Sequence, residues 1–271
     1  MTYKFIYKTL IIGLSLGLML PASATDFAKS KLLAEQGDAQ AQYEMGEYYF
    51  NGYDVPQSYA LAEVWYQKAA EQGNADAQTA IGLAYFNGDG VRRDYKKAMT
   101  WFQQAAAGNN IEAQTAIGSM YLNGQGVEKD YPKALEWLKK AETQGNSYAQ
   151  TAMGSMYLNG YGVRQDSVKA MEWHEKAARQ GNAKAQTAIG LMYLKGDGVT
   201  KDYPRAIQWL QQAADLDNAI AQYNLAWIYE DGYGISKDKV IAKELFGQAC
   251  DNGYQKGCSA YHSAPNLYFN R

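Results

Sequence analysis

Histidine and cysteine are scarce in this chain, with two of each among 271 residues. Two histidines leave little capacity for general acid–base chemistry near neutral pH. Cys250, Cys258 and His262 do form a C-x7-C-x3-H cluster, but this spacing does not match the usual zinc motifs. We therefore expect no bound metal and no cofactor.

The chain has no large excess of either positive or negative charge. Lysine and arginine number 26 and aspartate and glutamate 28, which gives a formal net charge of −2. Without Lys4 and Lys8, which a predicted leader carries, 24 basic and 28 acidic residues remain, for a net charge near −4. A mildly acidic chain with dispersed charges does not attract nucleic acid or anionic lipid, so we exclude both as main partners. The hydrophobic share of 47% is sufficient for a folded core.

An uninterrupted apolar run lies at the N-terminus, over residues 9–20 (TLIIGLSLGLML). Lys4 and Lys8 precede this run, and an A-x-A pattern that ends at Ala24 follows it, as in a secretory signal peptide. Twelve residues are too few to span a bilayer as a retained anchor. We predict a signal peptide over residues 1–24, cleaved after Ala24. The mature protein is then periplasmic or secreted, from a Gram-negative-type bacterium, with no membrane insertion after cleavage.

The most prominent feature of the sequence is its self-similarity. AQTAIGSMYLNGQGV at residues 113–127 returns as AQTAMGSMYLNGYGV at residues 149–163, thirty-six residues later. Six copies keep this register from Ala39 to Tyr254 without an insertion. The recurring tyrosines are Tyr49, Tyr85, Tyr121, Tyr157, Tyr193 and Tyr229. A period of this length is typical of a solenoid, in which each unit buries its apolar face against its neighbours.

Each unit reads as two helices. In the third copy, the four-residue spacing of apolar side chains predicts a first helix, helix A, over residues 111–123. Gly124 and Gly126 then end it, because glycine adopts positive φ readily. A second helix, helix B, is predicted over residues 131–144, with Asp130 as its N-cap. The equivalent N-cap residues in the other copies are Ser58, Asp94, Asp166, Asp202 and Asp238.

A glycine recurs inside helix A, where it costs roughly 1 kcal/mol relative to alanine. These glycines are Gly46, Gly82, Gly118, Gly154 and Gly190, with Ala226 in the sixth copy. Repeating a costly residue five times requires a packing reason, and we expect helix B to approach closely there. The sequence therefore predicts an all-α fold, a right-handed α-solenoid of stacked antiparallel helix pairs.

The unit A-x-A-Q-x-x-(I/M/L)-G-x-x-Y-x-x-G-x-G-V-x-x-D-x-x-K-A-x-x-W-x-x-K-A-A-x-x-G-x resembles the Sel1-like repeat, a relative of the tetratricopeptide repeat. The resemblance covers about four-fifths of the chain. Repeat 6 departs most, with Leu245 in place of the recurring tryptophan. Outside the repeats we expect an N-terminal capping helix over residues 25–38 and a C-terminal partial repeat and tail over residues 255–271, in a monomeric protein. The expected repeats are 39–74, 75–110, 111–146, 147–182, 183–218 and 219–254.

The two cysteines occupy neighbouring positions in the repeat. Cys250 stands near the end of the last helix B, and Cys258 stands in the helix A that follows. Together with the export signal, this placement favours a disulfide, with a buried free pair as the alternative. The A-C-x7-C pattern also resembles one found in every unit of cysteine-rich Sel1-like proteins. Closing so short a loop contributes on the order of 2.5 kcal/mol in the chain-entropy model.

No constellation of catalytic residues emerges. His174 stands where other repeats carry Tyr66, Phe102 and Leu138, so we interpret it as a partly exposed packing residue. Some cysteine-rich relatives bind or slowly hydrolyse penicillins, and Ser236–Lys239 (SKDK) matches the Ser-x-x-Lys pattern of β-lactamases and penicillin-binding proteins. However, no S-D-N or K-T-G element accompanies it, and an ordinary turn is the better interpretation. We expect a protein that is not an enzyme.

Partner-binding residues are expected on the concave face of the solenoid, which helix A lines. By tetratricopeptide geometry, the side chains three before and one, four and five after the Gly46-type position face this groove. Exposed aromatics are typical binding anchors. The asparagine row either holds the backbone of an extended peptide or terminates helix A. The predicted partner-binding residues are Tyr43, Glu47, Leu83, Ser119, Ser155, Leu191, Tyr223, Trp227, Asn51, Asn87, Asn123 and Asn159.

The signal pattern indicates an exported protein, the lack of a catalytic constellation indicates a non-enzymatic one, and the resemblance implies that it binds another protein or an extended peptide. Sel1-like proteins generally act as adaptors in signalling, envelope assembly or host contact. One alternative is an immunity protein that neutralises a periplasmic phospholipase effector of type VI secretion. The remaining alternatives are a weak penicillin-binding hydrolase and a host-protein binder.

Overall fold

A computed structural model of the chain describes residues 24–264, and every regular element within them is an α-helix. The all-α solenoid predicted from the repeat is confirmed. The predicted signal peptide lies outside the described residues except for its last residue. No helix in the described range is both long and apolar enough to cross a membrane. The chain divides into two compact units after Asn146, which we call the N-terminal and the C-terminal unit.

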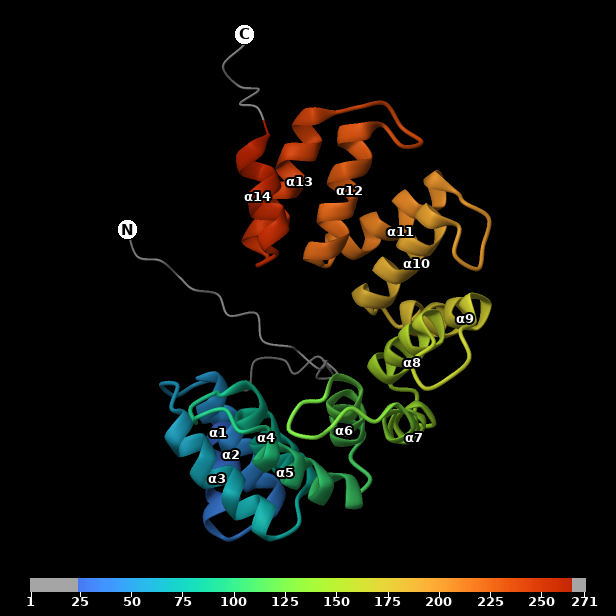
Figure 1. Cartoon of the computed structure of the whole chain (residues 1–271). Coiled ribbons are helices and arrows are strands. Elements are labelled where there is room, and N and C mark those ends of the chain that lie inside the picture. The colour runs from blue at the N-terminus through green and yellow to red at the C-terminus, as the bar shows by residue number, and fades with distance from the viewer. Residues whose placement is uncertain (1–23, 265–271) are drawn as a thin grey trace. The chain divides into compact units, whose positions relative to one another are not determined.

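The N-terminal unit is a stack of seven helices, in which one single helix precedes three antiparallel A–B pairs (Figure 1). Neighbours in the chain are neighbours in space, as a solenoid requires. Its helices are α1 (Ala24–Glu35), α2 (Ala39–Asn51), α3 (Tyr59–Glu71), α4 (Ala75–Asn87), α5 (Tyr95–Ala107), α6 (Ile111–Asn123) and α7 (Tyr131–Glu142).

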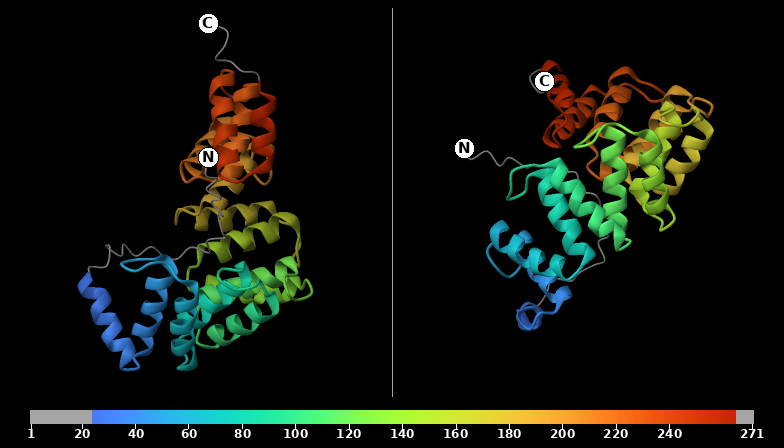
Figure 2. Two further views of the ribbon diagram at one scale, coloured as in Figure 1. Left: turned by 90° about the vertical axis from the view of Figure 1, so that its left-hand side faces the viewer. Right: turned by 60° about the horizontal axis from the view of Figure 1, so that its bottom comes forward.

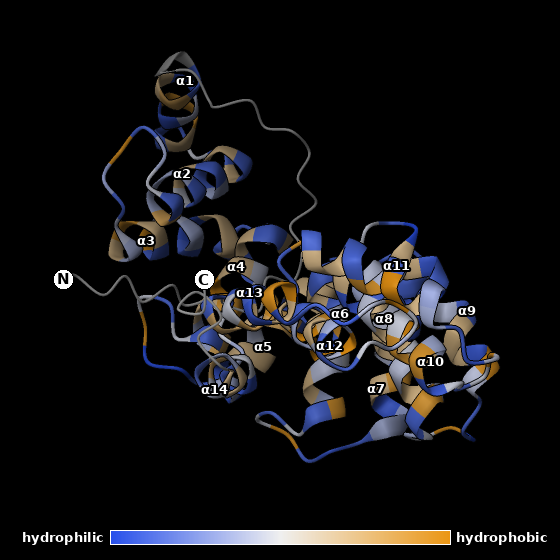
Figure 3. Ribbon diagram, turned by 90° about the horizontal axis from the view of Figure 1, so that it is seen from above, coloured by the Kyte–Doolittle hydropathy of each residue, from blue (hydrophilic) through white to orange (hydrophobic). Residues whose placement is uncertain are grey.

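The C-terminal unit has three A–B pairs followed by one single helix, and Figure 2 shows the pairs from two further sides. Hydrophobic and hydrophilic residues are interleaved along the helices (Figure 3), because each helix buries only one face. Its helices are α8 (Ser147–Asn159), α9 (Ser167–Ala178), α10 (Ala183–Lys195), α11 (Tyr203–Asp215), α12 (Ala219–Asp231), α13 (Lys239–Asp251) and α14 (Gln255–Ser263).

Local chemistry sets the helix ends. Asp130 has an extended backbone, and its carboxylate accepts a hydrogen bond from the Lys133 backbone N–H, which lacks a partner within the helix. The predicted cap residues of the other five B helices accept equivalent bonds. At the end of α6, Gly124 adopts a φ of 72°, a left-handed conformation that terminates the helix. The predicted helix starts and the helix A end are therefore confirmed.

The glycine inside helix A admits a side chain from helix B. A Cβ atom added at Gly82 would lie 2.6 Å from the Phe102 ring, and one at Gly118 would lie 2.8 Å from Leu138 Cγ. Both distances are far shorter than van der Waals contact, so an alanine there would force a displacement. The packing reason expected for these glycines is confirmed. The residue that fills the space is the one after the recurring tryptophan.

His174 belongs to this buried column, so the expectation of a partly exposed packing residue is wrong. Its side chain has no solvent exposure, and a Cβ at Gly154 would lie 2.6 Å from its Cε1 atom. Neither ring nitrogen has a hydrogen-bond partner. Loss of water lowers the pKa of His174 to about 4, so the imidazole is neutral near pH 7. His174 is buried because the equivalent residues of the other repeats, such as Phe102 and Leu138, are buried. Partial exposure was expected only because histidine is polar.

A recurring glutamine near the start of helix A connects helix A to its neighbours. The side-chain amides of Gln42, Gln78 and Gln222 donate to backbone carbonyls near the end of the preceding helix. The amide oxygen of Gln42 accepts from Gln72, thirty residues later, at 2.8 Å. The same contact joins three further pairs, namely Gln114 with Gln144, Gln150 with Gln180, and Gln222 with Asn252.

Repeats 2 and 5 lack this contact, since Gly108 has no side chain that could donate in repeat 2, and in repeat 5 a single substitution should restore it. Leu216 occupies the donor position and is 54% exposed, which leaves the buried Oε1 atom of Gln186 without a partner. We expect Leu216→Gln to raise the free energy of unfolding by about 1 kcal/mol, because an unsatisfied buried acceptor costs about 1–3 kcal/mol. Urea denaturation measures this change. Leu216→Ala is the control, and an equal gain from it would assign the effect to removal of an exposed leucine.

The two cysteines are bonded in the structure, across the turn between α13 and α14, with a Cα–Cα distance of 4.4 Å. The predicted disulfide pairing is therefore present. It joins α14, which has no helix B of its own within the described residues, to the last complete repeat. Lys243 adds a second connection, because its ammonium group donates to the carbonyl of Ala264 at 3.2 Å.

Candidate protein-binding surface

The side chains expected to bind a partner lie on one flank of the A helices, which we call the A face. It comprises positions 2, 5, 9, 12 and 13 of each repeat, counted from Ala39 in the first. At position 9 every residue is at least partly solvent-exposed, and Trp227 reaches 40%. The other residues at position 9 are Glu47, Leu83, Ser119, Ser155 and Leu191. This row is accessible to a partner.

The threonines of position 5 contribute less than their place suggests. Thr79, Thr115 and Thr187 are buried, and each hydroxyl donates to the carbonyl four residues earlier. Tyr43 and Tyr223 replace threonine in the first and last repeats and remain partly exposed. Position 5 therefore offers one partly exposed aromatic ring in each unit, Tyr43 or Tyr223, and mostly buried threonines elsewhere.

The asparagine row mostly serves the protein itself. The amide of Asn51 donates to the Glu47 carbonyl at 3.0 Å, and that of Asn159 donates to the Ser155 carbonyl at 2.8 Å. Asn87 donates to the Asp89 carboxylate at 3.1 Å. These contacts favour a role at the helix C-terminus over a peptide clamp. Asn123 is exposed at the equivalent place.

In the C-terminal unit the A face carries an aromatic cluster on α12. Tyr223 lies 6.2 Å from Trp227, 5.7 Å from Phe246 and 5.1 Å from Tyr254, measured between ring centroids. Trp227 in turn lies 5.3 Å from the Phe246 ring. Phe246 is buried, so it fixes the two more accessible rings from below. A rigid and partly exposed aromatic cluster is typical of an interaction hot spot.

In the N-terminal unit the A face is acidic. Glu47, Asp76 and Glu112 come from α2, α4 and α6 in turn. Burial, together with the negative charges of Asp76 and Glu47, raises the pKa of Glu112 to about 7. The pKa of Glu47 is also raised by burial, although hydrogen bonds from Tyr66 and Asn51 oppose the shift. The three carboxylates therefore act on one another across successive repeats.

The sequence interpretation missed position 2, which supplies two of these carboxylates. The sequence nevertheless indicates this position, because its residue type changes from one repeat to the next. Its residues are Gln40, Asp76, Glu112, Tyr148, Lys184 and Ile220. Because the glutamine at position 4 and the tyrosine at position 11 do not vary, such variation marks a place where the copies differ in what they contact.

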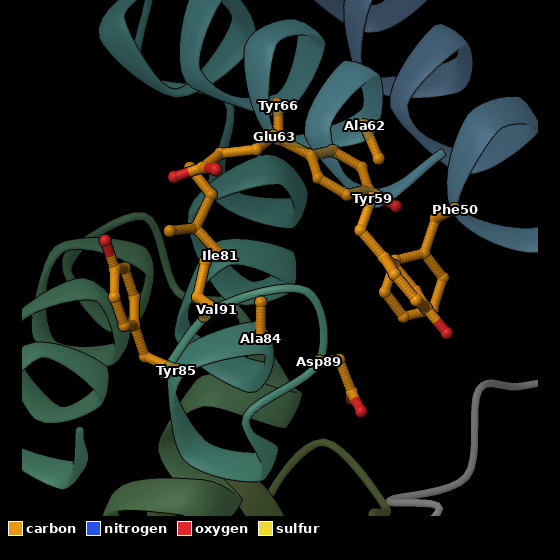
Figure 4. Close-up of a pocket in the computed structure, with 10 residues that line it drawn as sticks. All are labelled: Phe50, Tyr59, Ala62, Glu63, Tyr66, Ile81, Ala84, Tyr85, Asp89 and Val91. Atoms are coloured by element: carbon orange, nitrogen blue, oxygen red, sulfur yellow. The ribbon is translucent and has the colours of Figure 1, made fainter. Parts of the chain in front are cut away.

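The N-terminal unit contains a small cavity. A cavity of about 20 Å³ lies between α2, α3, α4 and the loop after α4, which is room for about one water molecule. Figure 4 shows its lining, with the Phe50 and Tyr59 rings side by side. Within residues 24–264, no group of three or more histidine, cysteine, aspartate or glutamate side chains could hold a metal ion. This cavity is too small to hold a side chain of a partner protein.

Comparison with known proteins identifies the repeat. The Sel1 repeat model matches residues 39–74, 75–110, 111–146, 147–182, 183–218 and 219–254. The chain belongs to the Sel1 repeat family. It is thus a scaffold of the kind that mediates protein–protein interaction. No curated protein matches the chain.

Solved structures share this Sel1 fold. A Sel1 repeat protein from Oxalobacter formigenes is 30% identical with a TM-score of 0.76, and the match covers 83% of this chain and 94% of that one. A protective antigen of uropathogenic Escherichia coli is 32% identical with a TM-score of 0.59, over 87% of this chain. The match spans only 58% of the antigen's own length. An immunity protein from Pseudomonas aeruginosa is 22% identical with a TM-score of 0.56, over 79% of this chain and 81% of that one, and shows a common fold alone.

Proposed function

We propose that this Sel1 repeat protein is an exported, non-enzymatic adaptor that binds another protein through the A face. The observation that carries the proposal is the aromatic cluster on α12, where Trp227 is 40% exposed beside Tyr223. Exposing a large ring costs hydrophobic free energy that a binding partner would recover. The N-terminal signal pattern supports export, and the family supports protein binding.

Affinity capture from the native envelope tests this function. The tagged full chain should retain a specific protein, and Trp227→Ala or Tyr223→Ala should reduce its capture at least tenfold, as loss of a hot-spot side chain does. Tyr233→Ala is the matched control, because Tyr233 is 44% exposed in the same unit but stacks on Tyr203 away from the A face. Equal capture by all three variants would contradict the proposed surface.

A second candidate is immunity against a periplasmic phospholipase effector of type VI secretion. The fold shared with an immunity protein is compatible with it, although 22% identity carries no function. The discriminating measurement is survival of cells that lack this protein when they are exposed to effectors encoded beside its gene. Undiminished survival against every such effector would exclude this candidate.

A further inference from the structure

The A helices of the N-terminal unit differ from the rest of the unit in their charge. The sequences of α2, α4 and α6 contain four acidic residues, Glu44, Glu47, Asp76 and Glu112, and no lysine or arginine. All basic residues of the unit's repeats lie on the B helices and in the loops. The negative charge of the A helices is therefore uncompensated along their own surface.

Contacts between repeats bring these carboxylates onto one surface. The amide of Asn110, at the start of α6, donates to the Asp76 carboxylate on α4 at 2.8 Å. Asn74 makes the same contact with Gln40 one repeat earlier, at 3.2 Å. Position 2 thus lies beside the start of the next A helix, which places Asp76 close to Glu112. Within residues 24–146 no lysine or arginine forms an ion pair with Glu47, Asp76 or Glu112.

An aromatic ring accompanies the carboxylates. Tyr43 is partly exposed on α2 and packs on the buried ring of Tyr66, with a centroid distance of 5.9 Å. The hydroxyl of Tyr66 donates to Glu47, which fixes that carboxylate beside the ring. The charges of Glu47, Asp76 and Glu112 all act on Tyr43, so the ring and the three carboxylates share one environment. Carboxylates next to a held aromatic face form a receptor for a lysine or arginine side chain.

We propose that the A face of the N-terminal unit docks a basic segment of a partner protein, in which a lysine or arginine side chain meets Glu112 and Asp76 and packs against Tyr43. Charge complementarity selects this occupant, because the face is acidic, partly apolar and free of cations. The inference rests on the proposed protein-binding function and names the chemistry of the partner at this second place.

Peptide binding to the full chain tests the inference. The probe is a fluorescein-labelled ten-residue peptide of alternating arginine and leucine, and its twin carries glutamate in place of each arginine. Fluorescence anisotropy should show the basic peptide binding at least tenfold more tightly than the acidic twin. Added NaCl should weaken this binding, because the contacts are between charges. Equal affinity of the twins, or no binding of the basic peptide, would overturn the inference.

Variants assign the effect to this face. Glu112→Gln should weaken the basic peptide about fivefold, and the Asp76→Asn/Glu112→Gln double variant at least tenfold. Tyr43→Leu, which keeps an apolar side chain, should weaken it severalfold. Glu63→Gln is the control, because Glu63 is exposed on α3, and it should change affinity less than twofold. A loss from Glu63→Gln equal to that from Glu112→Gln would show non-specific attraction and overturn the assignment.

This test separates the inference from the function on which it rests. If the basic peptide fails to bind while envelope capture still depends on Trp227, the charge inference is wrong and the adaptor function stands. Circular dichroism of each variant verifies folding. Glu112→Gln should be at least as stable as the parent above pH 7, because it removes a carboxylate that is ionised there in partly dehydrated surroundings.

Discussion

Lowering the pH from 7 to 5 should reduce the free energy of unfolding by about 2 kcal/mol through His174 alone, and by about 3 kcal/mol at pH 4. Burial holds the pKa of His174 near 4 in the folded chain, against 6.5 for an exposed histidine. Between these values the unfolded chain binds a proton that the folded chain does not. The effect of His174 on the free energy of unfolding is therefore small above about pH 6.5, and the free energy falls as the pH drops toward 4.

His174→Leu isolates this effect, because leucine fills the same column at Leu138 and Leu210. The variant should be more stable than the parent by about 1–3 kcal/mol at pH 7, since it removes two unpartnered buried nitrogens. Urea denaturation of both proteins at pH 7 and pH 5 measures the difference. Carboxylates titrate in both proteins and cancel in the comparison.

The second histidine provides the control. His262 is exposed on α14, so His262→Leu controls for the replacement of a histidine that lies outside the buried column. A stability difference between parent and His174→Leu that stays constant from pH 7 to pH 5 would contradict the linkage. It would show that His174 reaches water or a hydrogen-bond partner in solution.

Reduction of the Cys250–Cys258 disulfide should lower the free energy of unfolding by about 2.5 kcal/mol, because the bond restricts a short loop in the unfolded chain. The loss should concentrate at the C-terminal end, where the bond attaches α14 to the last repeat. Hydrogen exchange should therefore increase most in α14 and the end of α13.

A Cys250→Ser/Cys258→Ser double variant serves as the reference for this experiment. It should match the reduced parent in stability and should not respond to a reducing agent. Any further response of the double variant would mean that the reductant acts elsewhere. Equal protection of α14 in the oxidised and reduced proteins would show that packing, including the Lys243 contact, already holds this helix.

Much of the fold was predictable because each structural decision is made locally and then repeated. Asp130 caps its helix through its own carboxylate, and Gly124 ends one through its own backbone freedom. Neither depends on a distant partner, so the sequence around it suffices. His174 is the counter-example. Its surroundings are set by the helix column into which the repeat places it, and a polar residue in an apolar column is misread when it is judged by its own chemistry.

The candidate site was only partly predictable for the same reason. Exposed aromatics such as Trp227 stand out, because they replace smaller residues at a fixed register. The bonding of Asn51 and Asn159 back to their own helices depends on side-chain direction, which the register does not give. The mutual influence of Asp76 and Glu112 arises between residues thirty-six positions apart. This influence depends on how successive repeats pack against one another, which the spacing in the sequence does not show.

The glutamine contact has an evolutionary consequence. Each copy carries the recurring glutamine, and at Gln42, Gln78 and Gln222 the side-chain amide donates to a backbone carbonyl of the preceding helix, so a segment of thirty-six residues carries its own means of attachment to the helix before it. Duplication or deletion of a whole segment would change the length of the protein without requiring a new kind of contact between repeats.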